Sequence, residues 1–148
     1  MRKFLAVLLS VTLLATLAVL PAAAESTVTL DNIKIGFVHV SDPSDMGYTY
    51  NHDLGTQKMK AELGLRDDQI ISIYNVKDTD DASIEAALQE LIDDNCNIIF
   101  GTSFGFENCM LTAAKDNPDI QFCHATGYQA ASSGLANMEK RMRSFVGS

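Results

Sequence analysis

The chain has 148 residues, a formal net charge of -8 at pH 7, and 47% hydrophobic residues. This length is enough for one domain with a hydrophobic core and too short for two. The acidic balance argues against nucleic-acid binding, because a protein that binds nucleic acid neutralises phosphates with Lys and Arg.

The first 24 residues have the pattern of a signal peptide. Basic Arg2 and Lys3 precede an apolar run over 4–20, and Ala22 and Ala24 form a small-residue cleavage site. A membrane-spanning anchor is the rival interpretation, but the polar stretch that follows favours cleavage after Ala24. No cysteine stands at this site to carry a lipid. We therefore expect export to the periplasm or the outer face of the plasma membrane, with membrane association only through partners.

Four apolar runs, at 33–40, 70–76, 97–100 and 120–124, predict β-strands. Helical patterns over 50–63, 82–95 and 107–117 separate them, and Gly64 and Pro118 are typical stop signals for the first and third. This alternation predicts an α/β fold, a doubly wound parallel sheet with strand order 2-1-3-4 and helices on both faces. The segment 129–148 is partly basic, and no fifth strand is expected in it.

The three cysteines, Cys96, Cys109 and Cys123, form an odd set that allows at most one disulfide. Cys96 and Cys109 flank a strand, which separates them too far for a bond. A bond between Cys109 and Cys123 is left open by the spacing. We expect all three to be buried as small apolar residues.

Ligands of such sheets bind at the carboxyl ends of the strands, which directs attention to 41–53, 101–108 and 125–128. In the first segment Asp45 can accept ligand hydrogen bonds, Tyr48 can stack on a flat ring, and Gly47 allows close backbone approach. The alternative is that Asp45 or Thr49 only caps the following helix.

The second segment opens a helix whose free N–H groups can meet a polar or anionic ligand group. Ser103 is its polar side chain, and Phe104 and Phe106 are candidate walls of a binding cleft. Residues 101–105 also fit the G-x-S-x-G pattern of a hydrolase nucleophile, with Asp119 and His124 following in the Ser, Asp, His order. A secreted serine hydrolase is therefore the alternative from another functional class, although Asp119 begins its strand at the opposite edge.

A metal site is a third possibility, because six side chains able to bind metal could lie near the same edge. Their spacing matches no metal-binding motif, and no phosphate-binding glycine loop is present, so we expect neither a metal nor another cofactor. The six residues are His39, Asp42, Asp45, His52, Asp53 and His124.

Three motifs together carry a family resemblance: DMGYTYNHDLG at 45–55, IFGTSFGF at 99–106 and HATGY at 124–128. In this order and spacing they resemble the basic membrane protein (PnrA-like) family of substrate-binding proteins of ABC transporters. The resemblance runs from about Lys34 to Tyr128. It implies a periplasmic-binding-protein-like fold of class I and a ligand, mainly a purine nucleoside or its base, held between two lobes.

By this resemblance Asp45 hydrogen-bonds the ligand, Tyr48 stacks on the base where relatives often carry tryptophan, and Ser103 and Phe104 line the cleft. The implied partners are that small-molecule ligand and the permease of an ABC importer. A ligand-sensing module of a membrane receptor, with the same site, is a further alternative.

Family members continue past Tyr128 into a second lobe. We therefore expect 25–128 to form the N-terminal lobe of a truncated binding protein, 129–148 to be a tail outside the resemblance, and the single lobe to bind weakly.

Overall fold

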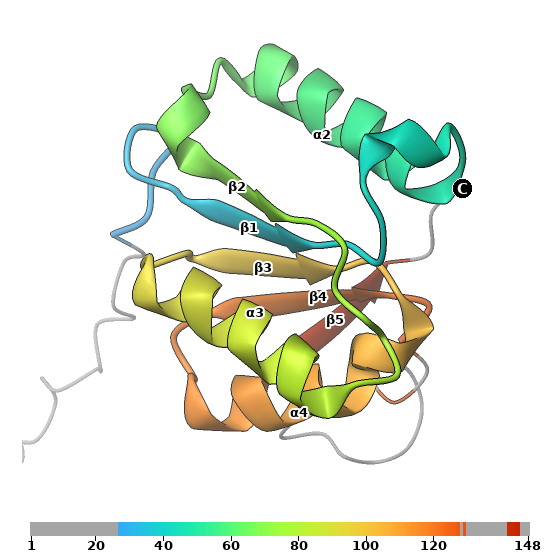
Figure 1. Ribbon diagram of the computed structural model, residues 1–148. Helices are drawn as coiled ribbons and strands as arrows, with labels where there is room; N and C mark the ends of the chain where they lie inside the picture. Colours follow the sequence, from blue (N-terminus) through green and yellow to red (C-terminus); the bar gives the residue numbers. More distant parts are fainter. Residues whose placement is uncertain (1–26, 128, 130–141, 146–148) are drawn as a thin grey trace, which may run out of the picture.

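The computed structural model describes residues 27–127, Gln129 and the backbone of 142–145. The expected signal peptide, 1–24, lies outside the described residues. The core of the fold is a parallel sheet with strand order β2-β1-β3-β4-β5 (Figure 1). Its strands are β1 (Ile35–Val38), β2 (Ile70–Ile73), β3 (Ile98–Gly101), β4 (Gln121–Ala125) and β5 (Met142–Phe145).

The structure confirms the predicted α/β class and the order 2-1-3-4, but the expectation of no fifth strand is wrong. Strand β5 pairs in parallel with β4, with Met142 opposite Phe122 and Phe145 opposite Ala125. Edge pairing uses backbone N–H and C=O groups, so the short segment Met142–Phe145, with Arg143 and Ser144 at its centre, can still supply an edge strand. The sheet therefore extends one strand beyond the segment that resembled a known family.

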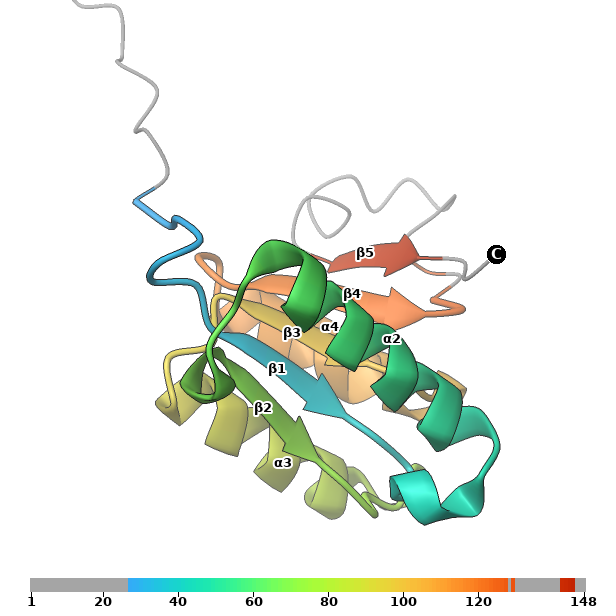
Figure 2. The ribbon, with the colours of Figure 1, turned by 90° about the horizontal axis from the view of Figure 1, so that it is seen from above.

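Helices cover the two faces of the sheet unequally. Helix α2 (Tyr48–Leu63) lies on one face, while α3 (Asp81–Asp93) and α4 (Glu107–Asp116) pack side by side on the other (Figure 2). Alternation along β3 fits this arrangement: Ile99 and Gly101 are buried toward α3 and α4, whereas Ile98 and Phe100 are half-buried on the α2 side. The face beneath α3 and α4 therefore holds the main core.

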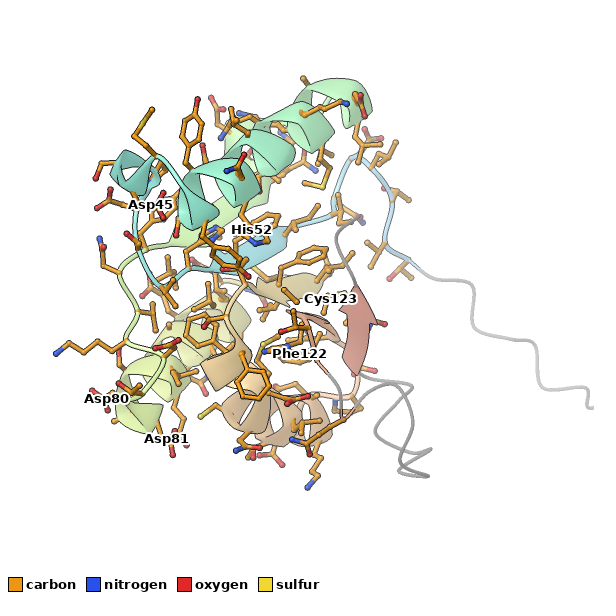
Figure 3. The ribbon with its side chains drawn as sticks, turned by 90° about the vertical axis from the view of Figure 1, so that its right-hand side faces the viewer. Asp45, His52, Asp80, Asp81, Phe122 and Cys123 are labelled. Carbon is orange, nitrogen blue, oxygen red and sulfur yellow. The ribbon has the colours of Figure 1, made fainter. Side chains whose placement is uncertain are left out.

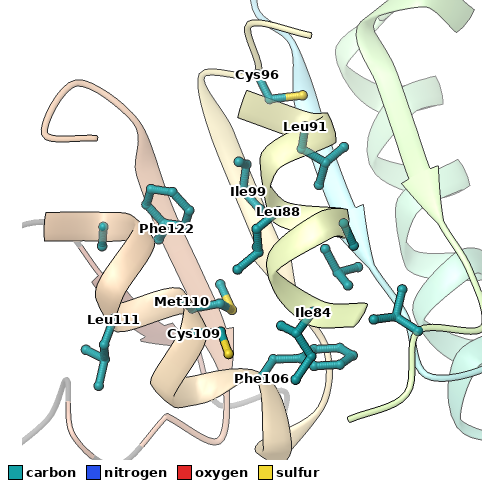
Figure 4. Close-up of a cluster of buried hydrophobic side chains, with 14 residues drawn as sticks. Ile84, Leu88, Leu91, Cys96, Ile99, Phe106, Cys109, Met110, Leu111 and Phe122 are labelled. Carbon is teal, nitrogen blue, oxygen red and sulfur yellow. The ribbon is translucent and has the colours of Figure 1, made fainter. Parts of the chain in front are cut away.

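The main core forms where the apolar stripe of α3 meets the sheet (Figure 4). Ile84, Leu88 and Leu91 recur at i, i+4 and i+7, the spacing that puts side chains on one face of a helix. A Cβ at Gly36 of β1 would lie 2.8 Å from a methyl group of Leu91, so glycine allows this close approach. Gly101 leaves room in the same way for the buried Met110 of α4.

The face under α2 is less apolar. Its core cluster consists of Ile35, Phe37 and Leu65, and the buried residues of α2 itself are two threonines. The helix ends at Gly64, whose φ of 66° is the left-handed conformation that glycine adopts without strain. Helix α2 is therefore delimited mainly by the residues at its ends and is held to the sheet by few buried apolar side chains.

The three cysteines are free thiols, with Cys96 and Cys109 buried and Cys123 half-buried. The expectation of three fully buried cysteines therefore holds for two of them. Within the described residues, no helix combines the length and the apolar character that crossing a membrane requires.

We expect Leu91→Ala to lower the free energy of unfolding by about 2–5 kcal/mol, because it leaves a cavity in the main core. Leu91 is 0% exposed, whereas Leu63 at the end of α2 is 45% exposed and provides a matched control. Urea unfolding of both variants is the measurement. An equal effect of Leu63→Ala would contradict the assignment of the core to the α3 face.

Candidate functional site

The candidate site lies at the carboxyl edge of the sheet, where the connections after β1, β2, β3 and β4 meet. Figure 3 looks onto this edge, with Asp45 beside the start of α2 and with Asp80 and Asp81 at the start of α3. The sequence directed attention to three of these connections. The fourth, after β2, contributes Asp78, which sequence reasoning missed.

Asp45 caps helix α2. Its carboxylate accepts backbone N–H bonds from Gly47 (2.9 Å), Thr49 (2.8 Å) and Tyr50 (3.0 Å). These bonds lower the pKa of Asp45 to about 2, and the bond from Gly47 has the largest effect. Burial acts in the opposite direction. Asp45 is therefore an ionised, exposed carboxylate held in a fixed position. It also caps α2, as the alternative interpretation of the sequence predicted.

Tyr48 is held by its hydroxyl and by a ring contact, and its side chain keeps exposed surface. Its hydroxyl donates to the carbonyl oxygen of Thr102 at the end of β3, and its ring meets His52 edge-on at 4.6 Å. The side chain is still 52% exposed. A ring held in this way is preorganised to stack on a flat ligand.

The other two predicted residues of the first loop support the turn. Gly47 is the N-cap residue of α2, and Thr49 is fully buried behind Asp45. Thr49 offers no surface to a ligand, so the structure corrects its predicted role from ligand contact to support of the loop.

Ser103 is held by hydrogen bonds at its hydroxyl and at its carbonyl. The hydroxyl donates to Oδ2 of Asp78 (2.6 Å), while the carbonyl oxygen accepts from Nε2 of His124 (2.7 Å). Thr102, just before it, donates its hydroxyl to the carbonyl of Val38 (3.0 Å). The loop after β3 is thereby fixed to β1, to the loop after β2 and to β4.

The two phenylalanines of this loop have opposite environments. Phe104 is 64% exposed, whereas Phe106 is 0% exposed and belongs to the main core cluster. The prediction that Phe106 contacts ligand is therefore wrong, because its side chain packs beneath the loop in a short 3-10 helix, η3 (Phe104–Phe106). Only Phe104 presents an aromatic side chain at the surface of this loop.

A buried histidine lies under the site. The Thr102 hydroxyl donates to Val38, so it accepts from Nδ1 of His39 (3.1 Å), which assigns the proton of the imidazole to Nδ1. The ring stacks on Tyr74 at 5.1 Å. Burial, with the nearby His52, lowers the pKa of His39 to about 4. His39 is therefore a neutral structural residue near pH 7.

Backbone strain also concentrates at this edge. Thr126, which follows β4, has a φ of 64°, a conformation unusual for a β-branched residue. Met46 and Asn75 in the neighbouring loops also have positive φ. Strain of this kind costs on the order of 1–3 kcal/mol per residue and clusters at functional sites, which is consistent with a candidate site at this edge.

The contacts do not form a serine hydrolase site. The Ser103 hydroxyl bonds Asp78 and not His124, and His124 bonds the serine's carbonyl oxygen. Asp119 precedes β4 and His124 lies near its end, a separation of about 16 Å along an extended strand. Among the described residues, no group of three or more His, Cys, Asp or Glu side chains could hold a metal ion.

Comparisons with known proteins found a matching family model and similar sequences. A family model described as "ABC transporter substrate-binding protein PnrA-like" matches residues 32–145. A purine-binding protein of Brucella abortus (strain 2308) is 32% identical over 101 residues, which is 68% of this chain and 28% of that protein. A putative ABC transporter glucose-binding protein, TsgA13 of Haloferax volcanii, is 26% identical over 99 residues, 67% of this chain and 24% of that protein.

A solved ABC transporter solute-binding protein from Conexibacter woesei shares the fold, with a TM-score of 0.60 and 13% identity over 77% of this chain and 35% of that one. The chain thus spans about a quarter of the length of the two sequence relatives and about a third of the structural one.

Acidification should destabilise the fold before its carboxylates titrate. The pKa of His39 is 6.5 in the unfolded chain and about 4 in the folded one, so stability is full above pH 6.5 and falls toward pH 4. Protonation of His39 in the unfolded chain should lower the free energy of unfolding by roughly 2–3 kcal/mol between pH 7 and 4.5. Urea unfolding across this range checks the slope. His39→Gln should flatten it, and an unchanged slope would contradict this role.

Thr126→Gly should raise the free energy of unfolding by about 1 kcal/mol, because glycine adopts a positive φ without strain. Thr112→Gly, on the exposed side of α4, is the control and should lower it by a few tenths of a kcal/mol. Thermal or urea unfolding distinguishes the two, and a loss of stability in Thr126→Gly would rule out strain at this position.

Proposed function

Because the chain belongs to the PnrA-like family of ABC transporter substrate-binding proteins, we propose that it binds a purine nucleoside or nucleobase for delivery to an ABC importer. Proteins of this family bind a substrate for transport and are not enzymes. The proposed site consists of Asp45, Tyr48, Ser103 and Phe104. Gly47 shapes the loop that carries the first two.

One observation carries the proposal: the carboxyl edge of the sheet presents two exposed aromatic side chains, one of them anchored through its hydroxyl, and a carboxylate held in a fixed position. Tyr48 bonds the carbonyl of Thr102, and Phe104 follows two residues later in the same loop. Asp45 lies three residues before Tyr48, with its charge held by backbone N–H groups. Flat aromatic faces suit a purine ring, and a carboxylate accepts hydrogen bonds from amino or hydroxyl groups.

The purine class is also supported by the relative from Brucella abortus, which is named a purine-binding protein. A sugar is the second candidate, since the relative from Haloferax volcanii is named a glucose-binding protein. Purines and sugars differ in the contacts that they make, because a purine stacks on aromatic faces over a larger area than a glucose does.

We further propose that 25–128 acts as the first lobe of a two-lobed binding protein that is exported by the 1–24 signal peptide. The permease would then be its membrane partner. One lobe taken alone buries only part of a ligand, so residues 25–128 alone should bind weakly, and closure against a second lobe would supply the remaining affinity.

Titration calorimetry of the refolded chain 25–148 with adenosine, guanosine, adenine and glucose tests the proposal. We expect weak, saturable heat with the purines and no chemical change of the ligand by chromatography afterward. Tyr48→Ala or Phe104→Ala should weaken purine binding at least about tenfold, since an aromatic stacking pair is worth roughly 1 kcal/mol beyond its buried area.

Leu54→Ala is the matched control, because Leu54 is also an exposed large apolar residue of α2 and should leave binding unchanged. Binding of glucose alone would select the sugar candidate. No heat with any of the four ligands from a folded chain would reject the proposal for this chain, and conversion of a ligand would reject the binding-protein class.

A further inference from the structure

Asp78 lies at the candidate site although no sequence motif pointed to it. It belongs to the turn between β2 and α3, and its half-buried carboxylate accepts the Ser103 hydroxyl at 2.6 Å. The two loops are also in direct contact, since a Cβ at Gly105 would collide with the carbonyl oxygen of Asp78. The contact between Asp78 and Ser103 is therefore fixed by the packing of both loops.

This contact determines which hydrogen bonds Ser103 can make. A serine hydroxyl has one hydrogen to donate and can also accept. Its hydrogen is committed to Asp78, and a charge-assisted bond of this kind is stronger than one between neutral groups. The Ser103 hydroxyl can therefore only accept a hydrogen bond from a ligand. With Asp45, it makes the edge a surface that accepts hydrogen bonds.

Acidic residues at the helix starts also oppose the binding of anions here. Helix N-termini attract phosphate through free N–H groups, but Asp45 already takes three N–H groups at the start of α2. Asp81 lies in the first turn of α3 and Glu107 in that of α4. The sequence predicted a polar or anionic ligand group at the α4 start, and the charges around it favour the polar group over the anionic one.

We propose that Asp78 is a specificity-determining residue: by holding the Ser103 hydrogen, it makes the site favour uncharged ligands that donate hydrogen bonds and reject ligands that carry phosphate. This inference rests on the proposed function and concerns the same site. In nucleoside chemistry it distinguishes a nucleoside from its monophosphate, because the two share base and ribose and differ in the charged group.

The test is titration calorimetry at pH 7 with adenosine and adenosine 5′-monophosphate. The wild-type chain should bind adenosine at least tenfold more tightly than the monophosphate. Asp78→Asn keeps the shape but can donate to Ser103, which frees the serine hydrogen for the ligand. It should weaken adenosine binding about tenfold and bring the two affinities to within about threefold of each other.

Two further variants separate this effect from general damage. Ser103→Ala should weaken adenosine binding without improving monophosphate binding, and it tests the same bond if Asp78→Asn does not fold. Asp116→Asn removes the same charge from the exposed carboxyl-terminal end of α4, which is far from the site, and should change neither affinity. Circular dichroism establishes that each variant is folded.

Each outcome has a distinct meaning. Equal wild-type affinity for both ligands, or an unchanged preference in Asp78→Asn, would overturn the inference while the proposed function stands. Absence of any nucleoside binding by the folded wild-type chain would overturn the proposed function and the inference together. If the preference for adenosine over the monophosphate is smaller in Asp78→Asn and unchanged in Asp116→Asn, the proposed function and the inference are both supported.

Discussion

Close contact between the sheet and the helices on its α3 and α4 side is the constraint on which the structure depends. Gly36 and Gly101 have no side chain on that face, so Leu91 and Met110 lie almost against the strand backbone. This contact fixes the positions of β1 and β3 relative to α3 and α4. Because the loops of the site leave the ends of these same strands, their positions follow from the packing beneath them.

Hydrogen bonds then convert this scaffold into a rigid site. Ser103, Thr102 and His124 connect the loop after β3 to three other parts of the carboxyl edge, and Asp45 holds the first turn of α2. The hydroxyl groups of Thr102 and Ser103 both have protein partners in this network and do not need a ligand for support. The side chains of Tyr48 and Phe104 keep exposed surface that a ligand can contact. Such preorganisation reduces the entropy that binding would otherwise cost.

The sequence predicted the fold well because hydrophobic periodicity is a local signal. The stripe of Ile84, Leu88 and Leu91 and the alternation of strands with helices identified the sheet order correctly. Strand β5 was missed because edge pairing depends on backbone groups and leaves little pattern in the side chains.

The site was harder to predict. Phe104 and Phe106 look equivalent in the sequence, and only the turn of the 3-10 helix between them directs one outward and the other into the core. Asp78 could not be identified because its bond to Ser103 joins residues 25 positions apart, and no local motif records such a pair.

Helix α2 differs from the rest of the molecule in what holds it in place. It buries two threonines, and an apolar groove of about 200 Å³, lined by Phe37, Met59 and Phe100 among others, remains between it and the sheet. The element that carries Tyr48 thus contributes little to the main core. Substitutions on the exposed face of α2 should therefore cost little stability, so the recognition surface is free to vary in evolution, whereas the close packing on the α3 and α4 side restricts substitution there.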